Sequence, residues 1–196
     1  MGPWGGSGGT GGGAGGAAAT GGSGAYGAGG SGGQGATGAG GSHCVDIGIG
    51  EANQTEQTAF SLSIPALTDC DSDGGVVSGV VAGPSDVDWF TYRGNDTSTC
   101  SVDPYVFFDT ADPGVRICLF LECETGATEL TACPVGSDTS VSPGGRAGCC
   151  NTSGFDIADS FNCAGSVDDN AYVYMRVDHP QAPPDTCDSY VLSYHY

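Results

Sequence analysis

All ten cysteines of this 196-residue chain lie after a glycine-rich stretch of 42 residues. Disulfides form and persist in oxidising compartments, whereas cytosolic glutathione reduces them. An even number of cysteines in the folded part therefore predicts a disulfide-stabilised, exported protein, either extracellular or displayed at the cell surface. The cysteines are Cys44, Cys70, Cys100, Cys118, Cys123, Cys133, Cys149, Cys150, Cys163 and Cys187.

Residues 1–42 contain 22 glycines and no charged side chain. So little apolar side-chain area cannot offset the entropy lost when a backbone becomes ordered. We expect this stretch to be a disordered linker with an end-to-end distance of roughly 35 Å. The sequence therefore divides into a linker, 1–42, and a single folded domain, 43–196.

The N-terminus lacks the features of an export signal. A signal peptide starts with a basic region and an apolar region of about 7–15 residues, whereas glycine follows Met1 at once. We therefore expect an upstream start or an upstream signal, which would also be the only route to membrane attachment. No stretch approaches the roughly 18 apolar residues of a membrane span, so we expect no transmembrane segment.

Residues 43–196 contain all 23 acidic residues and all four arginines, and the chain has no lysine. The formal net charge of −19 disfavours nucleic-acid binding and anionic membrane surfaces, because like charges repel. Divalent cations and basic partners remain compatible with this charge. A general role in solubility explains the same excess without any ligand.

The apolar pattern of the folded part has a period of two, which is typical of β-strands. In 171–177 the residues Ala, Val, Met and Val alternate with Tyr, Tyr and Arg. Together with turn-forming clusters between the segments, this pattern predicts an all-β, antiparallel sandwich. We expect strands at 76–81, 88–93, 102–108, 115–122, 171–177 and 190–196, and a long, polar, disulfide-stapled loop at 133–166.

Ten cysteines allow about 945 complete pairings, an extension of the 105 for eight cysteines. Cys149 and Cys150 are adjacent and should have different partners, because a bridge between neighbours is strained. We expect Cys123 to pair with Cys133 across a hairpin-like excursion. Zinc ligation is disfavoured because the chain has no C-x-x-C pair and its three histidines are scattered.

Carboxylates occupy alternate positions at Asp69, Asp71 and Asp73, followed by Gly74. This is how the first half of an EF-hand calcium loop is built. Position twelve of such a loop would be Val80 instead of glutamate, which excludes a true EF-hand. A shorter calcium loop and a solvated acidic loop both remain possible for these residues.

Aromatic and catalytic patterns give weaker indications. Trp89, Tyr172 and Tyr174 could form a binding face for a sugar or peptide, or they could pack beneath a covering segment. The sequence has neither a G-x-S-x-G nor an H-E-x-x-H motif, and ten cysteines can all pair. We therefore expect no enzymatic activity.

Several runs of the folded part resemble bacterial pre-peptidase C-terminal domains, and the Asp-Val-Asp-Trp-Phe run is the most specific of them. The resemblance covers most of 51–196 and implies a jelly-roll-like β-sandwich that is attached to exported proteins and has no catalysis of its own. The runs are Gly50–Thr55, Ala59–Phe60, Ser78–Val81, Ser85–Tyr92, Tyr172–Val177 and Ser189–Tyr194.

The same resemblance implies a second candidate calcium site, at the positions that match those of collagen-binding relatives. These positions are Glu51, Asn53, Asp86 and Asp88. Two functional hypotheses follow. The first is a non-catalytic, secreted or surface-tethered accessory or binding module, and the alternative is a calcium-dependent adhesion domain for an extracellular protein or glycan.

Overall fold

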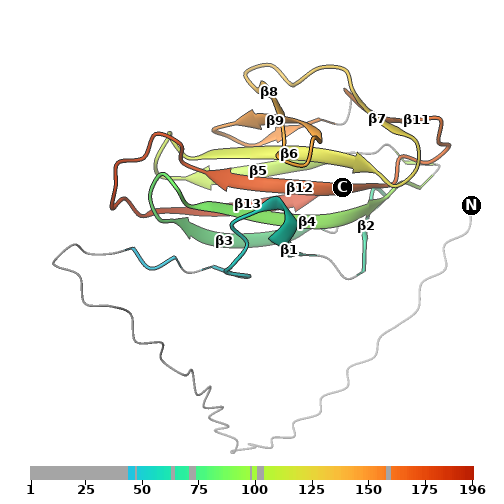
Figure 1. The fold of residues 1–196 in the computed structure, drawn as a ribbon. Helices are drawn as coiled ribbons and strands as arrows, with labels where there is room; N and C mark the ends of the chain where they lie inside the picture. Colours follow the sequence, from blue (N-terminus) through green and yellow to red (C-terminus); the bar gives the residue numbers. More distant parts are fainter. Residues whose placement is uncertain are drawn as a thin grey trace, which may run out of the picture. The chain divides into compact units, whose positions relative to one another are not determined.

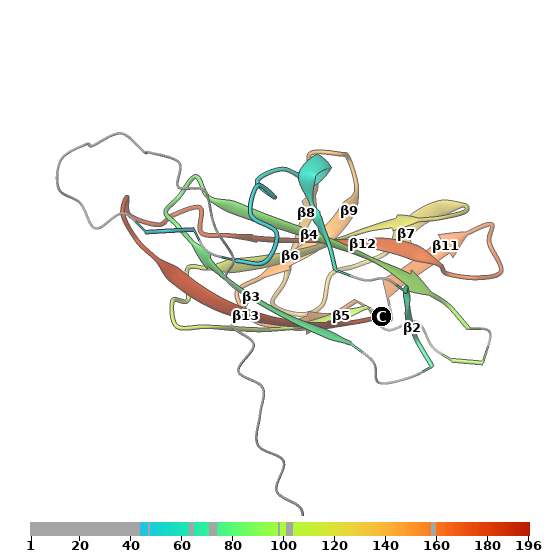
Figure 2. The same cartoon turned by 90° about the horizontal axis from the view of Figure 1, so that it is seen from below.

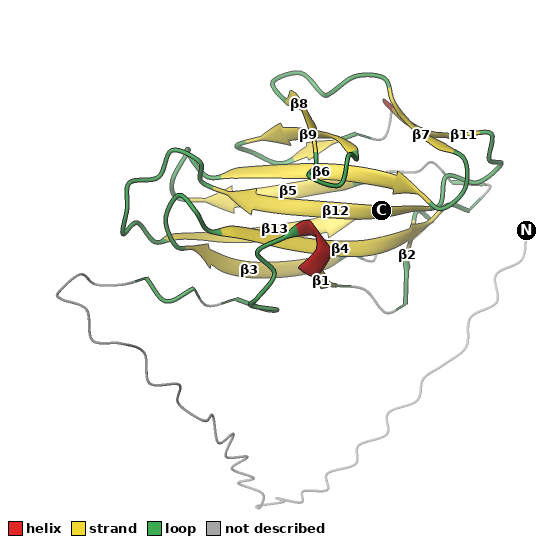
Figure 3. Cartoon of the chain, in the orientation of Figure 1, coloured by secondary structure: helices red, strands yellow, loops and turns green. Residues whose placement is uncertain are grey.

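The computed structural model describes residues 44–46, 48–62, 65–70, 74–97, 99–100, 104–157 and 160–196. The predicted linker, 1–42, lies outside these residues. The described part is all-β, as expected, and the helical turn η1 (Glu56–Thr58) is a short 3-10 turn (Figure 3). Within these ranges, no helix has the length and apolar character needed to cross a membrane.

The larger sheet has seven strands, with β12 at its centre between β4 and β6 (Figure 1). Met175 of β12 lies opposite Phe90 on one side and Leu119 on the other. The strand order is β1 (Phe60–Ser61), β4 (Val87–Asn95), β12 (Ala171–Asp178), β6 (Arg116–Cys123), β9 (Ala147–Asn151) and β8 (Asp138–Val141), and β2 (Leu67–Thr68) also pairs with β4.

The second sheet has four antiparallel strands, in the order β10 (Phe155–Asp156), β5 (Tyr105–Thr110), β13 (Asp188–His195) and β3 (Gly75–Val81). A third, two-stranded sheet joins β7 (Ala127–Leu130) to β11 (Phe161–Ala164). Figure 2 shows β3, β13 and β5 on one side of the domain and β4, β12 and β6 on the other.

The two larger sheets share one apolar core. Val77 and Leu192 of the small sheet and Phe90 and Met175 of the large sheet are at most 1% exposed and belong to the same cluster. The alternation predicted for 171–177 is confirmed, because the Ala, Val, Met and Val positions are buried and the intervening positions are more exposed. Burial of these faces against each other stabilises the domain, because it removes apolar surface from water.

The six predicted strands correspond to β3, β4, β5, β6, β12 and β13, but the loop predicted at 133–166 was wrong. This region contains β8, β9, β10 and β11. Its strands are only two to five residues long, too short for a period-two pattern to stand out in the sequence, and backbone pairing holds them in place. Gly148 allows the closest approach, because a Cβ there would lie 2.0 Å from the carbonyl oxygen of Leu119.

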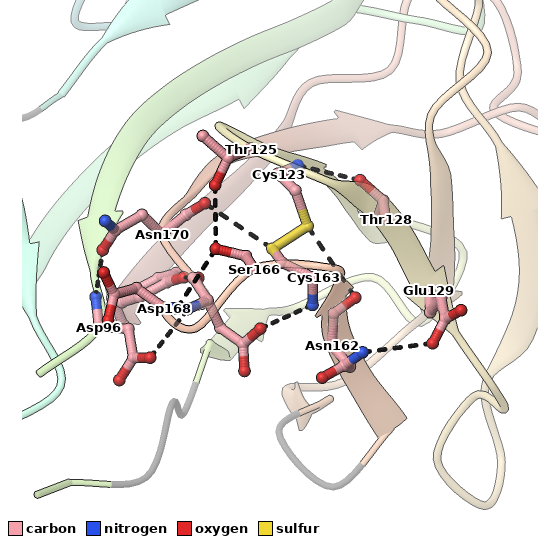
Figure 4. Close-up of a disulfide and its surroundings, with 12 residues drawn as sticks. Asp96, Cys123, Thr125, Thr128, Glu129, Asn162, Cys163, Ser166, Asp168 and Asn170 are labelled. Carbon is pink, nitrogen blue, oxygen red and sulfur yellow. Dashed lines mark hydrogen bonds between the residues drawn. A yellow bond between two sulfur atoms is a disulfide. The ribbon is translucent and has the colours of Figure 1, made fainter. Parts of the chain in front are cut away.

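All ten cysteines are paired, and Cys149 and Cys150 have different partners, as predicted. The expected Cys123–Cys133 bridge was wrong. Strand β11 places Cys163 opposite Thr128 of β7, and Thr128 Oγ1 accepts a hydrogen bond from the Cys123 backbone, so Cys163 lies beside Cys123 (Figure 4). The bridges are Cys44–Cys187, Cys70–Cys100, Cys118–Cys150, Cys123–Cys163 and Cys133–Cys149.

The turn η1 is fastened to the large sheet by Glu56, which is 4% exposed. Its carboxylate accepts hydrogen bonds from Ser142 Oγ (2.6 Å), from the backbone of Gly144 and from Arg146 Nη1 (2.6 Å). Burial raises the pKa of Glu56, but these hydrogen bonds outweigh it, and the pKa lies below its ordinary value. Glu56 therefore anchors the segment that precedes β1.

Candidate metal centre

The segment before η1 is held against the start of β4. The backbone N–H of Trp89 donates to the Asn53 carbonyl (3.0 Å), and that of Val87 donates to Gln54 Oε1 (3.2 Å). The backbone turns sharply here, because Gly50 and Ala52 have φ values of +87° and +84°. A left-handed conformation is rare for alanine, so this turn is tightly constrained by its surroundings.

This turn brings three carboxylates together. Asp46, Glu51 and Asp88 each offer an oxygen atom within 4.8 Å of the other two. Asp88 is 2% exposed, and its Oδ2 accepts a hydrogen bond from Tyr190 Oη at 2.7 Å. Asp88 Oδ1 and Asp46 Oδ1 are buried without a hydrogen-bond partner in the described part of the chain.

The amide of Asn53 completes the cluster. It is 1% exposed and lies beside Asp88, where it partly opposes the rise in the pKa of that carboxyl. Neither its nitrogen nor its oxygen makes a hydrogen bond of normal geometry with any described residue. A buried polar group without a hydrogen-bond partner costs roughly 1–3 kcal/mol. An ion that binds the amide oxygen of Asn53 would remove part of this cost.

The pKa values of the carboxyls reflect the crowding. Partial desolvation raises the pKa of Glu51 to about 7, although the residue stays exposed at the surface, and a hydrogen bond with Asp46 and the charges of Asp46, Asp88 and Asp86 add to the rise. Burial also raises the pKa of Asp88 to about 6, against the hydrogen bond from Tyr190, and nearby Asp86 and Asp46 add to the rise. Both shifts show that added negative charge is disfavoured here.

No arginine of the described chain forms an ion pair with this cluster, because all four pair with carboxylates outside it. Arg93 pairs with Glu124, Arg116 and Arg176 with Asp178, and Arg146 with Glu56 and Glu122. The chain has no lysine. A cation from solution would supply the positive charge that the described arginines do not bring to the cluster.

The donor set fits calcium. Ca²⁺ takes six to eight oxygen ligands, chiefly from carboxylates, amide carbonyls and water. Asp46, Glu51 and Asp88 would supply carboxylate oxygens and Asn53 its amide oxygen. The unpartnered buried oxygen atoms of Asp46, Asp88 and Asn53 are the groups that such an ion would satisfy.

Three of the four residues implied by the family resemblance come together, namely Glu51, Asn53 and Asp88. Asp86 lies near them but accepts the Ala82 backbone N–H at 2.6 Å, so one of its oxygens closes the turn between β3 and β4. Asp46 was missed. A signal was present in the sequence, because Asp46 precedes two alternating glycines and then the Glu51 and Asn53 pair.

The other predicted acidic run is only partly described. Asp69 Oδ1 accepts the Thr97 backbone N–H at 3.0 Å, and burial raises the pKa of Asp69, with nearby Asp96 adding to the rise. Asp71 and Asp73 lie outside the described residues.

The three aromatic residues share the outer face of the large sheet but differ in access. Trp89 is 2% exposed and stacks on Phe120 with centroids 5.6 Å apart. Arg146 lies 4.0 Å above the ring of Tyr174 and covers it. Tyr172 is 40% exposed, so it presents more ring surface to a ligand than Trp89 does.

A more open surface, which was not among the predicted sites, lies on the outer face of the small sheet. Val76 and Phe107 are 68% and 62% exposed. Next to them is a hollow of about 510 Å³, lined in part by Ser78, Asp109 and Val191. The sequence did contain an indication of this surface, namely the adjacent apolar residues Val76-Val77 and Phe107-Phe108. Successive residues of a strand point to opposite faces, so one residue of each pair must face outward.

No protein-family profile, no curated protein and no solved structure matches this chain.

Proposed function

We propose that residues 43–196 form a non-catalytic, extracellular binding module that calcium stabilises. The observation that carries this proposal is the Asp46, Glu51 and Asp88 cluster, with its buried oxygen atoms that lack hydrogen bonds within the described residues. The five disulfides support an oxidising location, because cytosolic thiols are kept reduced.

The fold we propose is a jelly-roll-like β-sandwich related to pre-peptidase C-terminal domains. Two mainly antiparallel sheets around one core support it. The convergence of Glu51, Asn53 and Asp88, which the sequence resemblance implies, supports it independently of the strand pattern.

Calcium would act here as a clamp. Asp88 belongs to β4, whereas Asp46, Glu51 and Asn53 belong to the segment that enters the domain. One ion bound by both would hold this segment on the sheet, next to the Cys44–Cys187 bridge. Because unfolding separates the ligands, calcium would bind the native state alone and raise its stability by mass action.

The test is thermal unfolding of the oxidised protein with CaCl₂ and with chelator. At a calcium concentration about 100 times the Kd, the stabilisation is about 2.7 kcal/mol, which corresponds to roughly 5–10 °C for a domain of this size. Glu51→Gln and Asp88→Asn should abolish the shift. Asp109→Asn, a carboxylate on the exposed side of β5, is the matched control and should retain it, and a wild-type protein without a shift at 10 mM calcium would refute the proposal.

A second candidate function is calcium-dependent adhesion to an extracellular protein or polysaccharide. The hollow on the small sheet and the exposed Phe107 and Val191 beside it favour this function, because an exposed apolar patch often marks an interaction surface. Binding to immobilised matrix proteins and glycans should be lost with chelator and with Phe107→Ser. A protein that binds equally well in chelator would exclude the calcium-dependent form of this function.

A further inference from the structure

A second group of metal-binding side chains lies at the same end of the strands. The end of β12 pairs with the start of β6, and the start of β13 pairs with the end of β3, so the connections of both sheets meet there (left in Figure 1). The turn after β5 supplies Asp112, the residue after β12 is His179, and β13 begins with Asp188. Each offers a donor atom within 4.8 Å of the other two.

His179 is the central residue of this group and is 5% exposed. Its Nδ1 lies 2.8 Å from Asp188 Oδ2, and its Nε2 lies 3.9 Å from Asp112 Oδ1. With Nδ1 as the donor to Asp188, Nε2 carries a lone pair. Two acceptors, Nε2 and the Asp112 carboxylate, then face each other, and no described residue donates a hydrogen bond to Nε2.

The surrounding backbone holds this arrangement in place. Asp112 Oδ1 accepts the Gly114 N–H at 2.7 Å, which fixes the carboxylate within its turn. The carbonyl of His179 accepts the Ala182 N–H at 3.0 Å. A Cβ on Gly114 would lie 2.2 Å from His179 Nε2, so glycine is the residue that leaves room at this nitrogen.

We propose that His179 Nε2 and Asp112 bind a Zn²⁺-class transition-metal ion, with Asp188 as the outer-sphere carboxylate. An imidazole nitrogen with a carboxylate oxygen is a donor pair that suits zinc and its neighbours, whereas calcium prefers oxygen alone. Metal-binding histidines commonly donate their other N–H to a carboxylate, which fixes the tautomer. A tetrahedral ion with bonds of about 2.0–2.2 Å places its donors about 3.3–3.6 Å apart, so the 3.9 Å separation needs only a small inward movement.

The scattered histidines and the lack of a C-x-x-C pair disfavour zinc when the sequence is taken alone. The cysteines are indeed all in disulfides, so none of them can bind the metal. The fold supplies carboxylates as the partners of His179 instead. With two protein ligands and the remaining positions filled by water, the affinity should be in the micromolar range, well short of that of a structural four-ligand zinc site.

The test is calorimetric titration of ZnCl₂ into the oxidised full chain, with calcium present at saturation so that the Asp46, Glu51 and Asp88 cluster is blocked. One site of micromolar affinity is expected. His179→Gln should abolish it, and Asp188→Asn should weaken it by about 10–100-fold. His43→Gln, which removes a different histidine, and Glu51→Gln should leave it unchanged.

Asp112→Asn guards against loss of the fold, because the Asp112 side chain is 42% exposed, and it should weaken zinc binding at least tenfold with an unchanged near-UV spectrum. Zinc binding that survives both His179→Gln and Asp112→Asn would overturn the proposal, as would the absence of binding at 100 μM ZnCl₂. Loss of the calcium-induced thermal shift in Glu51→Gln with zinc binding intact would show that the two sites are independent.

Discussion

The raised pKa values of Glu51 and Asp88 predict, for the calcium site proposed there, that calcium affinity falls steeply as the pH is lowered from 7.5 to 5.0. Calcium binds the ionised carboxylates, so each proton that must leave weakens the apparent affinity. Without calcium the folded state holds these protons at a higher pH than the unfolded state, because the pKa values rise from 4.5 to about 7 for Glu51 and from 3.8 to about 6 for Asp88. Stability of the calcium-free protein should therefore decrease as the pH rises through this window.

The magnitude follows from the two groups. Asp88, with a pKa of about 6, is about one-tenth ionised at pH 5.0, which costs about tenfold in affinity. Glu51, with a pKa of about 7, would alone cost nearly 100-fold, but its exposure to solvent screens the interactions that raise its pKa, and we expect roughly tenfold. The expected loss is therefore roughly 100-fold, whereas carboxyls with ordinary pKa values would lose less than about twofold.

Calorimetric titration with CaCl₂ at pH 5.0, 6.0 and 7.5, at constant ionic strength, measures this directly. Each binding event should release protons, and the observed heat should therefore change with the ionisation enthalpy of the buffer. Asp109→Asn should reproduce the wild-type profile. An affinity that changes less than threefold between pH 5.0 and 7.5 would refute the assignment of Glu51 and Asp88 as ligands with raised pKa values.

Three further predictions concern stability. Glu56→Gln should lower the free energy of unfolding in urea by about 1–3 kcal/mol, because it breaks a buried charge-assisted hydrogen-bond network. In the wild type the pKa of Glu56 is lowered from 4.5, so this contribution should be present above about pH 4.5 and lost as the pH falls further. A variant with unchanged stability at pH 7 would contradict the anchor role. Replacing the Cys123–Cys163 pair by alanines should cost about 4 kcal/mol of stability and replacing the Cys133–Cys149 pair about 3 kcal/mol, because the first bridge closes the longer loop. Chemical denaturation checks which loss is larger, and peptide mapping of the oxidised protein checks the pairing. Gly50→Ala should destabilise the protein by about 1–3 kcal/mol, because Gly50 has a positive φ and a Cβ added there would lie 2.2 Å from Phe60. The control Gly145→Ala, with a similar φ and open space around it, should cost about 1 kcal/mol. Equal losses in thermal unfolding would show that Phe60 does not constrain this turn.

The strands were predictable where one face is apolar and the other polar, as in β12. They were hidden where the sequence lacks that contrast. The segment Asp138–Val141 becomes β8 because it pairs with β9 and lies close to the Cys133–Cys149 and Cys118–Cys150 bridges. Its partner β9 is the next strand along the chain, but β9 is itself held by pairing with β6, which lies outside this region, so no local apolar pattern revealed the hairpin.

Disulfide pairing was unpredictable for a related reason. Cys123 and Cys133 are ten residues apart, which favours them in any argument from chain proximity. The strand β7 reverses direction after β6 and pairs with β11, so the neighbour of Cys123 in space is Cys163, 40 residues away. The partner of Cys123 depends on sheet pairing and not on distance along the chain.

The position of Asp88 within its strand is the strongest local evidence for function. Asp88, Phe90 and Tyr92 share one face of β4, and Phe90 and Tyr92 are buried in the core between the two sheets. A carboxylate on this face is costly unless it is compensated, and Tyr190 of the opposite sheet satisfies only Oδ2. The alternation of β4 alone could have shown that Asp88 is a carboxylate at a core-facing position. It could not have identified Asp46 and Asn53, which come close to Asp88 only when the entering segment folds back onto β4.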